Sequence, residues 1–314
     1  MFKKATLIFA LILTAAGFVC AKNSDGKLEI IATLFPTYDF AVQIGGNKAN
    51  VYLILPAGME PHTFEPKSRD IVKINKSDIF IYTGKYMEPW VENLLKGIPN
   101  KNLKVVDASF GIKLLTSAKD DGDHKNHDTH QHHGQKDPHI WLDFANAQIM
   151  VDTIANALVE KDPQNKDFYL KNALQYKNKL ADLDKSFKQT LATAKHKTII
   201  YGGHFAFGYF TKRYGLKYES PYNGFSPNAE PSPKAIGELI KKLKASEIKY
   251  IYYEELIDPK VARTISQATG AKLELLHAAH NISKSDIKKG ITFINIMQSN
   301  LEKLKEGLEC RQQL

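Results

Sequence analysis

Histidine is concentrated in one short stretch of this chain. Five of its eleven histidines fall between positions 124 and 133, and the residues around them are polar or charged. Such a stretch cannot bury enough apolar surface to offset the entropy lost on ordering, so residues 119–136 are predicted to form a disordered loop. Neutral imidazole is a common ligand of zinc, copper and nickel, so the cluster indicates a metal. The loop histidines are His124, His127, His130, His132 and His133.

Single histidines elsewhere could build a more rigid site. His139 lies in residues 137–143, DPHIWLD, where the proline restricts the backbone and the apolar residues predict packed structure. Three more histidines each follow a short apolar run typical of a buried strand, and in open α/β sheets ligands bind beyond the carboxyl ends of strands. Four imidazoles, or three with a water or carboxylate, satisfy the tetrahedral preference of Zn²⁺. The candidate ligands are His62, His139, His204 and His277.

Acidic residues near these histidines are interpreted separately. Asp137 and Asp143 are candidates to orient His139 by hydrogen bonding, although a helix cap or a surface acid explains Asp143 equally well. Glu60 could serve as the general base of a zinc hydrolase. The histidines lack the close helical spacing of H-E-x-x-H, however, which counts against such an enzyme. The remaining acids, Glu254, Glu255 and Asp258, are interpreted as strand-end turn residues.

The amino-terminal stretch predicts export. Residues 1–21 combine Lys3 and Lys4 with an apolar run and a small-residue cleavage site, as in a signal peptide. The apolar run is shorter than the ~20 residues needed to span a bilayer, so no membrane span is expected after cleavage. A lipid anchor on Cys20 is the less favoured alternative, because Phe18 and Val19 are bulky. Cleavage would leave Cys310 as the single cysteine and exclude an internal disulfide.

The overall composition is that of a globular protein. The 314 residues are 43% hydrophobic and 25% charged, enough for two domains of about 150 residues. The net charge is +9, but the basic residues are interleaved with apolar positions along predicted helices. A solvated helix face explains that pattern better than a nucleic-acid surface, and export makes nucleic acid an unexpected partner.

Two halves with the same order of elements flank a helical segment. Short buried-type strands alternate with helices over 28–109 and again over 197–308, which predicts α/β lobes with parallel sheets. Residues 144–194 are helical in pattern, with a break near Asp162-Pro163. Its second part, 166–194, would reach about 43 Å as one helix and could join two lobes, a two-helix hairpin being the alternative. The predicted domains are 1–21 (signal peptide), 22–143 (first lobe), 144–194 (helical linker) and 195–314 (second lobe).

Five sequence motifs together resemble one family. The chain is similar to the ZnuA-type zinc-binding proteins of bacterial ABC transporters over nearly all of its mature length. The motifs are FPTY at 35–38, PAGMEPHTFEP at 56–66, DPHIWLD at 137–143, GHFAF at 203–207 and TFINIMQSNLEKLKEGL at 292–308. The resemblance implies two Rossmann-like lobes joined by a long rigid helix. It also implies a metal site in the inter-lobe cleft, with His62, His139 and His204 as ligands.

One position departs from the family pattern. The family commonly has an aspartate in an L-D-P-L context as the fourth ligand, whereas this chain has Leu275-Leu276-His277-Ala278. His277 is the best match, and His280, Glu60 or a water are the alternatives. A site made only of nitrogen ligands favours zinc over manganese, because Mn²⁺ prefers oxygen.

The resemblance predicts a function as well. The expected protein is a monomeric, periplasmic binding protein, not an enzyme, that delivers Zn²⁺ to the membrane permease of an ABC transporter. The histidine-rich loop is typical of zinc members, and it would hold zinc near the site by tethering. The alternatives are a manganese-binding member of the same family, a zinc-dependent hydrolase of the cell envelope, and an adhesin in which metal is structural.

Overall fold

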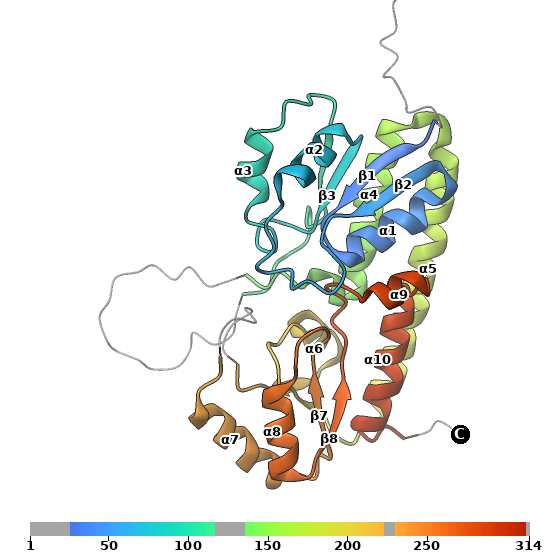
Figure 1. The fold of residues 1–314 in the computed structure, drawn as a ribbon. Helices are drawn as coiled ribbons and strands as arrows, with labels where there is room; N and C mark the ends of the chain where they lie inside the picture. The colour runs from blue at the N-terminus through green and yellow to red at the C-terminus, as the bar shows by residue number, and fades with distance from the viewer. Residues whose placement is uncertain (1–25, 117–135, 223–229, 312–314) are drawn as a thin grey trace, which may run out of the picture.

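The structure, a computed structural model, describes residues 26–116, 136–222 and 230–311. Its first lobe is built on a four-stranded parallel sheet with the strand order β2-β1-β3-β4. Figure 1 labels the first three of these strands side by side. The inner strands are almost wholly buried, as expected for parallel strands covered on both faces. The strands are β1 (Leu28–Ala32), β2 (Ala49–Leu53), β3 (Ile79–Tyr82) and β4 (Lys104–Asp107).

Helices alternate with these strands as predicted. The first helix begins at Phe35, because Pro36 fits the first turn of a helix. It ends at Gly45, and the next residue, Gly46, has a φ of 49° in the left-handed region that glycine tolerates. One helix of this lobe has only six residues. The helices are α1 (Phe35–Gly45), the short η1 (Gly46–Lys48), α2 (Ser68–Lys76) and α3 (Val91–Lys96).

The second lobe repeats this architecture. Its strands pair in parallel as β5-β6 and β7-β8, and a parallel bridge between Tyr201 and Tyr252 joins the two pairs. The resulting order, β6-β5-β7-β8, matches that of the first lobe, so the shared pattern of the two halves is confirmed. The elements are β5 (Thr198–Ile200), α6 (Gly208–Tyr214), β6 (Lys217–Glu219), α7 (Pro233–Lys244), β7 (Tyr250–Tyr253), α8 (Lys260–Thr269) and β8 (Lys272–Leu275).

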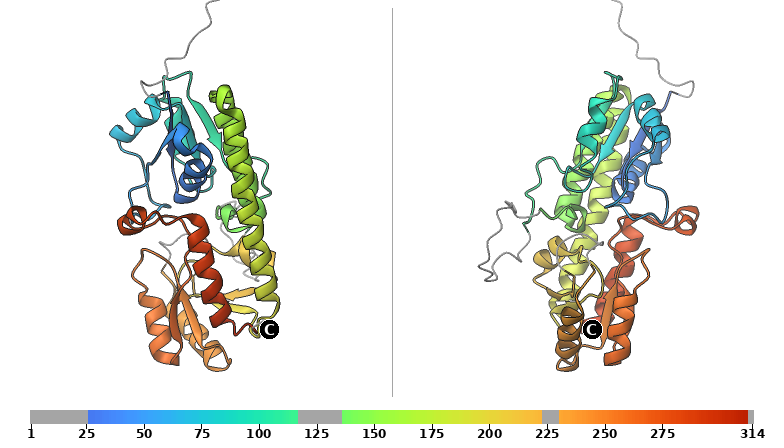
Figure 2. Two further views of the ribbon diagram at one scale, coloured as in Figure 1. Left: turned by 90° about the vertical axis from the view of Figure 1, so that its right-hand side faces the viewer. Right: turned by 60° about the vertical axis from the view of Figure 1, so that its left-hand side comes forward.

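A long helix connects the lobes. The helical segment consists of α4 (Phe144–Lys161), a short turn η3 (Pro163–Asn165) and α5 (Lys166–Ala192), so the break at Asp162-Pro163 and the single long helix are confirmed. Figure 2 shows α5 running beside both lobes. It is tied to the first lobe by Tyr176, which donates to Asp39 of α1 at 2.8 Å. It is tied to the second lobe by Asp184, which accepts from Arg213 of α6 at 2.6 and 2.7 Å.

The chain returns toward the first lobe after β8. Residues 276–292 pass between the lobes and include the short helix α9 (Lys284–Lys288), and α10 (Phe293–Gly307) then packs beside α5 (Figure 2). The Nδ2 atom of the buried Asn281 donates to the carbonyl oxygens of Pro56 and Met59 at 2.7 and 2.9 Å. These bonds join the carboxyl-terminal segment to the first lobe.

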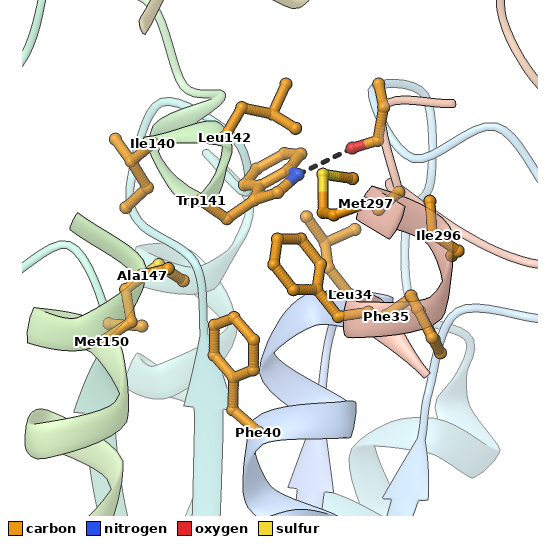
Figure 3. Packing of buried hydrophobic residues seen from close by; sticks show 14 of the residues in the cluster. Leu34, Phe35, Phe40, Ile140, Trp141, Leu142, Ala147, Met150, Ile296 and Met297 are labelled. Carbon is orange, nitrogen blue, oxygen red and sulfur yellow. Dashed lines mark hydrogen bonds between the residues drawn. The ribbon is translucent and has the colours of Figure 1, made fainter. Parts of the chain in front are cut away.

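Trp141 packs where the lobes meet. It belongs to the turn η2 (Ile140–Leu142), is fully buried, and lies among Leu34, Phe35 and Met297 (Figure 3). Its Nε1 donates to the carbonyl oxygen of Ala278 at 2.7 Å, the dashed line in Figure 3. The apolar contacts and this bond fix the segment that carries His139. Among the described residues, no helix combines the length and apolar character needed to cross a membrane.

Candidate metal centre

Four histidines from distant parts of the chain converge between the lobes. His62, His139, His204 and His280 each offer a ring nitrogen, and these four atoms lie within 4.8 Å of one another. The six distances between ring centroids are all similar, from 4.9 to 5.7 Å. Four points that are nearly equidistant form a tetrahedron, the arrangement that Zn²⁺ prefers. We refer to these residues as the four-histidine cluster.

Each lobe contributes to the cluster from loops at the inner ends of its sheet. His62 lies in the loop after β2 and His139 immediately before η2, whereas His204 follows β5 and His280 follows β8. These positions agree with the expectation that ligands bind beyond the carboxyl ends of parallel strands. His139, His204 and His280 are buried, and His62 is partly exposed.

A carboxylate contacts each of the three buried histidines at its backbone N–H and at its ring Nδ1. Asp137 Oδ1 accepts from the backbone N–H of His139 at 3.0 Å and lies 2.7 Å from its Nδ1. Glu255 Oε1 makes the same two contacts with His280, at 3.1 and 3.0 Å. A carboxylate on Nδ1 places the ring proton there, orients the ring and leaves Nε2 as the ligand atom.

Glu254 does the same for His204. Its Oε1 accepts from the backbone N–H of His204 at 3.2 Å, and its Oε2 contacts the Nδ1 atom. The Nε2 atoms of His62, His204 and His280 are buried and accept no hydrogen bond from any part of the chain that the structure describes. A metal ion would supply the missing partner, because buried polar atoms are rarely left unsatisfied.

Two glycines make room for these carboxylates. A Cβ atom on Gly203 would lie 2.7 Å from Glu254 Oε1, and one on Gly208 would lie 2.4 Å from Asp137 Oδ2. Both distances are too short for a side chain to be present. The glycines of the GGHFAFG motif therefore allow the carboxylates to reach His204 and His139.

The cluster is electrostatically prepared for a cation. Burial, and then the neighbouring His280 and His204, lower the pKa of His62 to about 2. Burial, followed by the nearby histidines, also holds the pKa of His139 well below its ordinary value. Both imidazoles are therefore neutral at physiological pH, which is the form that binds a metal. Burial raises the pKa of Asp137 to about 7.

The structure brings together three of the four predicted ligands and replaces the fourth. His62, His139 and His204 are in the cluster, but His277 lies outside it and the alternative, His280, takes its place. The Nδ1 atom of His277 accepts instead from the backbone N–H of Ala279 at 2.9 Å. His280, three residues further along the chain from β8 than His277, is the histidine that lies in the cluster.

The other candidates have structural roles or lie outside the described residues. Glu60 accepts from the backbone N–H groups of His62 and Thr63, both at 2.9 Å, and so closes the turn that carries His62. Asp143 caps α4 by accepting from Ala145 at 2.7 Å, as the helix-cap alternative predicted. Asp258 pairs with Arg263 at 2.9 Å. The signal peptide and the loop histidines His124, His127, His130, His132 and His133 fall outside the described residues.

Sequence analysis missed Glu254 and Glu255. Both were interpreted as strand-end turn residues, yet they are 7% and 8% exposed and hold two members of the cluster. Their position in the sequence could have indicated a role in the site. Two adjacent glutamates directly follow the apolar run of β7, and ligands bind beyond the carboxyl ends of parallel strands. Which histidines each would contact depends on the fold.

Fold and site together define a class of protein. Two α/β lobes joined by a long helix, with inward-facing ligands between them, are the architecture of a solute-binding protein, and the donor set suits a metal. A family model described as the periplasmic component A of the zinc-uptake complex, ZnuA, matches residues 30–307. The chain belongs to this family, whose described role is zinc uptake.

Individual relatives agree with this assignment. The high-affinity zinc uptake system protein ZnuA of Bacillus subtilis is 38% identical over 317 residues, which cover 98% of this chain and 99% of the relative. The zinc-binding lipoprotein AdcA of Streptococcus pneumoniae is 37% identical over 307 residues, or 97% of this chain. The chain spans only 61% of AdcA, so it corresponds to part of that protein.

Solved structures show the same fold. The Zn(II)-bound ZnuA-like domain of S. pneumoniae AdcA superposes with a TM-score of 0.76 at 36% identity, over 90% of this chain and 100% of that domain. The laminin-binding adhesin Lmb of Streptococcus agalactiae has a TM-score of 0.77 at 29% identity, over 90% of this chain and 99% of that one. The predicted fold class of two α/β lobes joined by a long helix is confirmed.

Proposed function

We propose that this protein binds Zn²⁺ as its transported cargo through His62, His139, His204 and His280, and delivers it to the permease of an ABC transporter. The observation that carries the proposal is the near-equal spacing of four imidazoles whose ring nitrogens converge. Four neutral nitrogen ligands suit Zn²⁺ and disfavour Mn²⁺, which prefers oxygen. Zinc-uptake relatives that cover nearly the whole chain support the same assignment.

Location and partners follow from this proposal. Zinc-binding relatives carry names that place them outside the cytoplasm, one as a lipoprotein and the family as periplasmic. We infer a periplasmic monomer that meets the permease at the outer face of the cytoplasmic membrane, with a lipid anchor on Cys20 as the alternative. Mass spectrometry of the protein from cell envelopes distinguishes a chain starting at Lys22 from one starting at a lipidated Cys20.

Competitive calorimetry tests the choice of metal. Zn²⁺ and Mn²⁺ are titrated into the metal-free mature chain and into its His139→Ala and His204→Ala variants. The expected result is one tight zinc site that is lost in both variants and is indifferent to manganese, because each lobe supplies part of the ligand set. Tight manganese binding, or tight zinc binding that survives both substitutions, would contradict the proposal.

The pH dependence of zinc binding should be weaker than that of a site made of four ordinary imidazoles. Four ordinary imidazoles of pKa near 6.5 would each lose about tenfold in affinity at pH 5.5, or roughly 10⁴-fold together. The pKa values of His62 and His139 are lowered, so these two imidazoles remain unprotonated over this range. Zinc affinity should therefore fall by much less than about 10⁴-fold between pH 7.5 and 5.5 in chelator competition. A 10⁴-fold fall would show that the imidazoles are not shielded.

The histidine-rich segment is proposed to collect zinc for this site. The described residues on its two sides are paired, since Thr116 bridges Lys136 and the N–H of Asp137 donates to the carbonyl of Leu115 at 2.9 Å. The segment therefore leaves and rejoins the fold close to His139, which favours a local tether. Deletion of residues 119–135 should leave zinc affinity at the cluster unchanged and slow zinc transfer from a dilute chelator. Equal transfer rates with and without the segment would refute this role.

A further inference from the structure

The path of the chain from β8 to His280 depends on one carboxylate. Glu255 accepts three hydrogen bonds, from the backbone N–H of Ala278 at 2.8 Å and from the backbone and ring nitrogens of His280 at 3.1 and 3.0 Å. The two backbone amides that donate to Glu255 therefore lie on either side of Ala279 in the chain.

Ala279 has a conformation that alanine avoids. Its φ is 60°, in the left-handed region, and its side chain is fully buried. The Cβ atom of an L-residue clashes with the backbone there, so such a conformation persists only where the surroundings hold it. The N–H of Ala279 does not reach Glu255 and donates instead to His277 Nδ1 at 2.9 Å.

The bond from Ala279 to His277 imitates a familiar turn. In an Asx-turn, the side chain of Asn or Asp accepts from the backbone N–H two residues later, which stabilises a chain reversal. The imidazole of His277 plays this part here. Burial lowers the pKa of His277 and keeps the ring neutral, so its Nδ1 lone pair is available to accept.

His277 is itself fixed to α10. Its backbone N–H donates to Asn300 Oδ1 at 3.0 Å, and its carbonyl accepts from Asn300 Nδ2 at 2.8 Å. Asn300 is 2% exposed, so this pair of bonds is protected from water. The backbone of His277 is therefore held in place, and its ring accepts from the N–H of Ala279.

We propose that His277 is a positioning residue, whose Nδ1 holds Ala279 in the left-handed conformation and thereby directs His280 toward the metal. The inference rests on the proposed zinc function of the four-histidine cluster. His277 lies outside the four-histidine cluster and so would not bind the metal itself. Its proposed role is to position a residue that does. The inference thus gives a role to the partly buried histidine that lies three residues before His280.

Two substitutions at one position separate this role from simple packing. His277→Leu keeps the bulk of the ring but removes the acceptor, whereas His277→Asn is smaller and restores an acceptor for the same N–H. Zinc affinity is measured by chelator competition, and the visible absorption of bound Co²⁺ reports whether the site is tetrahedral. His277→Leu should weaken zinc about tenfold, as loss of an outer partner does, and reduce the Co²⁺ absorption. His277→Asn should remain within about twofold of wild type with its Co²⁺ spectrum intact, since the hydrogen bond is kept.

A glycine provides an independent rescue. Glycine adopts positive φ without the Cβ penalty, so Ala279→Gly should recover most of the affinity and the Co²⁺ spectrum in the His277→Leu background. The inference is overturned if His277→Leu binds both metals as wild type does, or if His277→Asn loses as much as His277→Leu. Failure of the wild-type protein to bind zinc tightly is a separate result, which would reject the proposed function.

Discussion

The His280→Ala variant should bind zinc roughly 100- to 1,000-fold more weakly than the wild type. Four-ligand zinc sites in small domains supply about 10–16 kcal/mol, and one quarter of this is about 2.5–4 kcal/mol. The expected loss is larger than for any residue outside the cluster, because the ring nitrogen of His280 lies within 4.8 Å of the other three ligand atoms. Chelator competition at pH 7.5 gives the affinity ratio directly.

His277→Asn is the matched control for this prediction. The two histidines are three positions apart, both are largely buried, and both lie near Glu255, with nitrogen–oxygen distances of 3.0 Å for His280 and 3.6 Å for His277. If His277 were the fourth ligand, as the sequence predicted, its substitution would cause the large loss and His280→Ala would cause a small one. Near-normal zinc binding by His280→Ala would therefore indicate that His277, and not His280, is the fourth ligand.

Zinc should stabilise the folded protein by a large amount. The unfolded chain cannot bring together histidines from positions 62, 139, 204 and 280, so the metal binds the folded state at this site selectively. Free zinc at 1,000 times the dissociation constant then adds about 4 kcal/mol to the free energy of unfolding. At about 2.1 cal/mol/K of unfolding entropy per residue, the melting temperature of a chain of this size should rise by roughly 6 °C.

Differential scanning calorimetry checks this stabilisation. The metal-free protein is scanned with zinc, with zinc followed by excess EDTA, and with manganese at the same concentration. The increase should appear with zinc, disappear with EDTA, and be absent with manganese if the nitrogen ligands discriminate as proposed. A shift of similar size in the His280→Ala variant would place the stabilising zinc elsewhere.

Much of the fold follows from local sequence. Buried-type apolar runs correctly predicted the alternating strands. Gly46 and Gly270 follow helix ends with φ values of 49° and 78°. Ser232 and Pro233 stand at the start of α7, where the serine hydroxyl accepts from the N–H of Ala235 at 3.2 Å. Helix ends and caps depend on neighbours a few residues away, and for that reason a single sequence reveals them.

The strand boundaries were less well predicted. The run from Leu28 to Phe35 is continuous in hydrophobicity, but β1 ends at Ala32 and Phe35 starts α1. A strand and the helix that follows it both place apolar residues against the same core. Hydrophobicity alone therefore does not mark where the strand ends. The pairing partners, and hence the point where the ladder stops, are set by strands far away in the chain.

The sequence by itself determined the class of site. His62, His139 and His204 stand in motifs with fixed neighbours, and their types and their places after predicted strands indicate nitrogen ligands for zinc. The sequence surroundings of these histidines are local features. The end of an apolar run, a proline or a pair of glycines can each be recognised within a few residues. The alternating pattern in both halves and the long helical segment likewise indicated two lobes with a link between them.

Only the tertiary structure shows which histidine joins the cluster. His277 and His280 both follow β8, and Ala279 between them has a positive φ that alanine disfavours. The residues that hold this segment are distant in sequence: Glu255 after β7, Asn300 in α10 and Trp141 in the turn before α4. Which histidines the carboxylates contact could not be predicted from the sequence either. Those contacts depend on how the two lobes pack together.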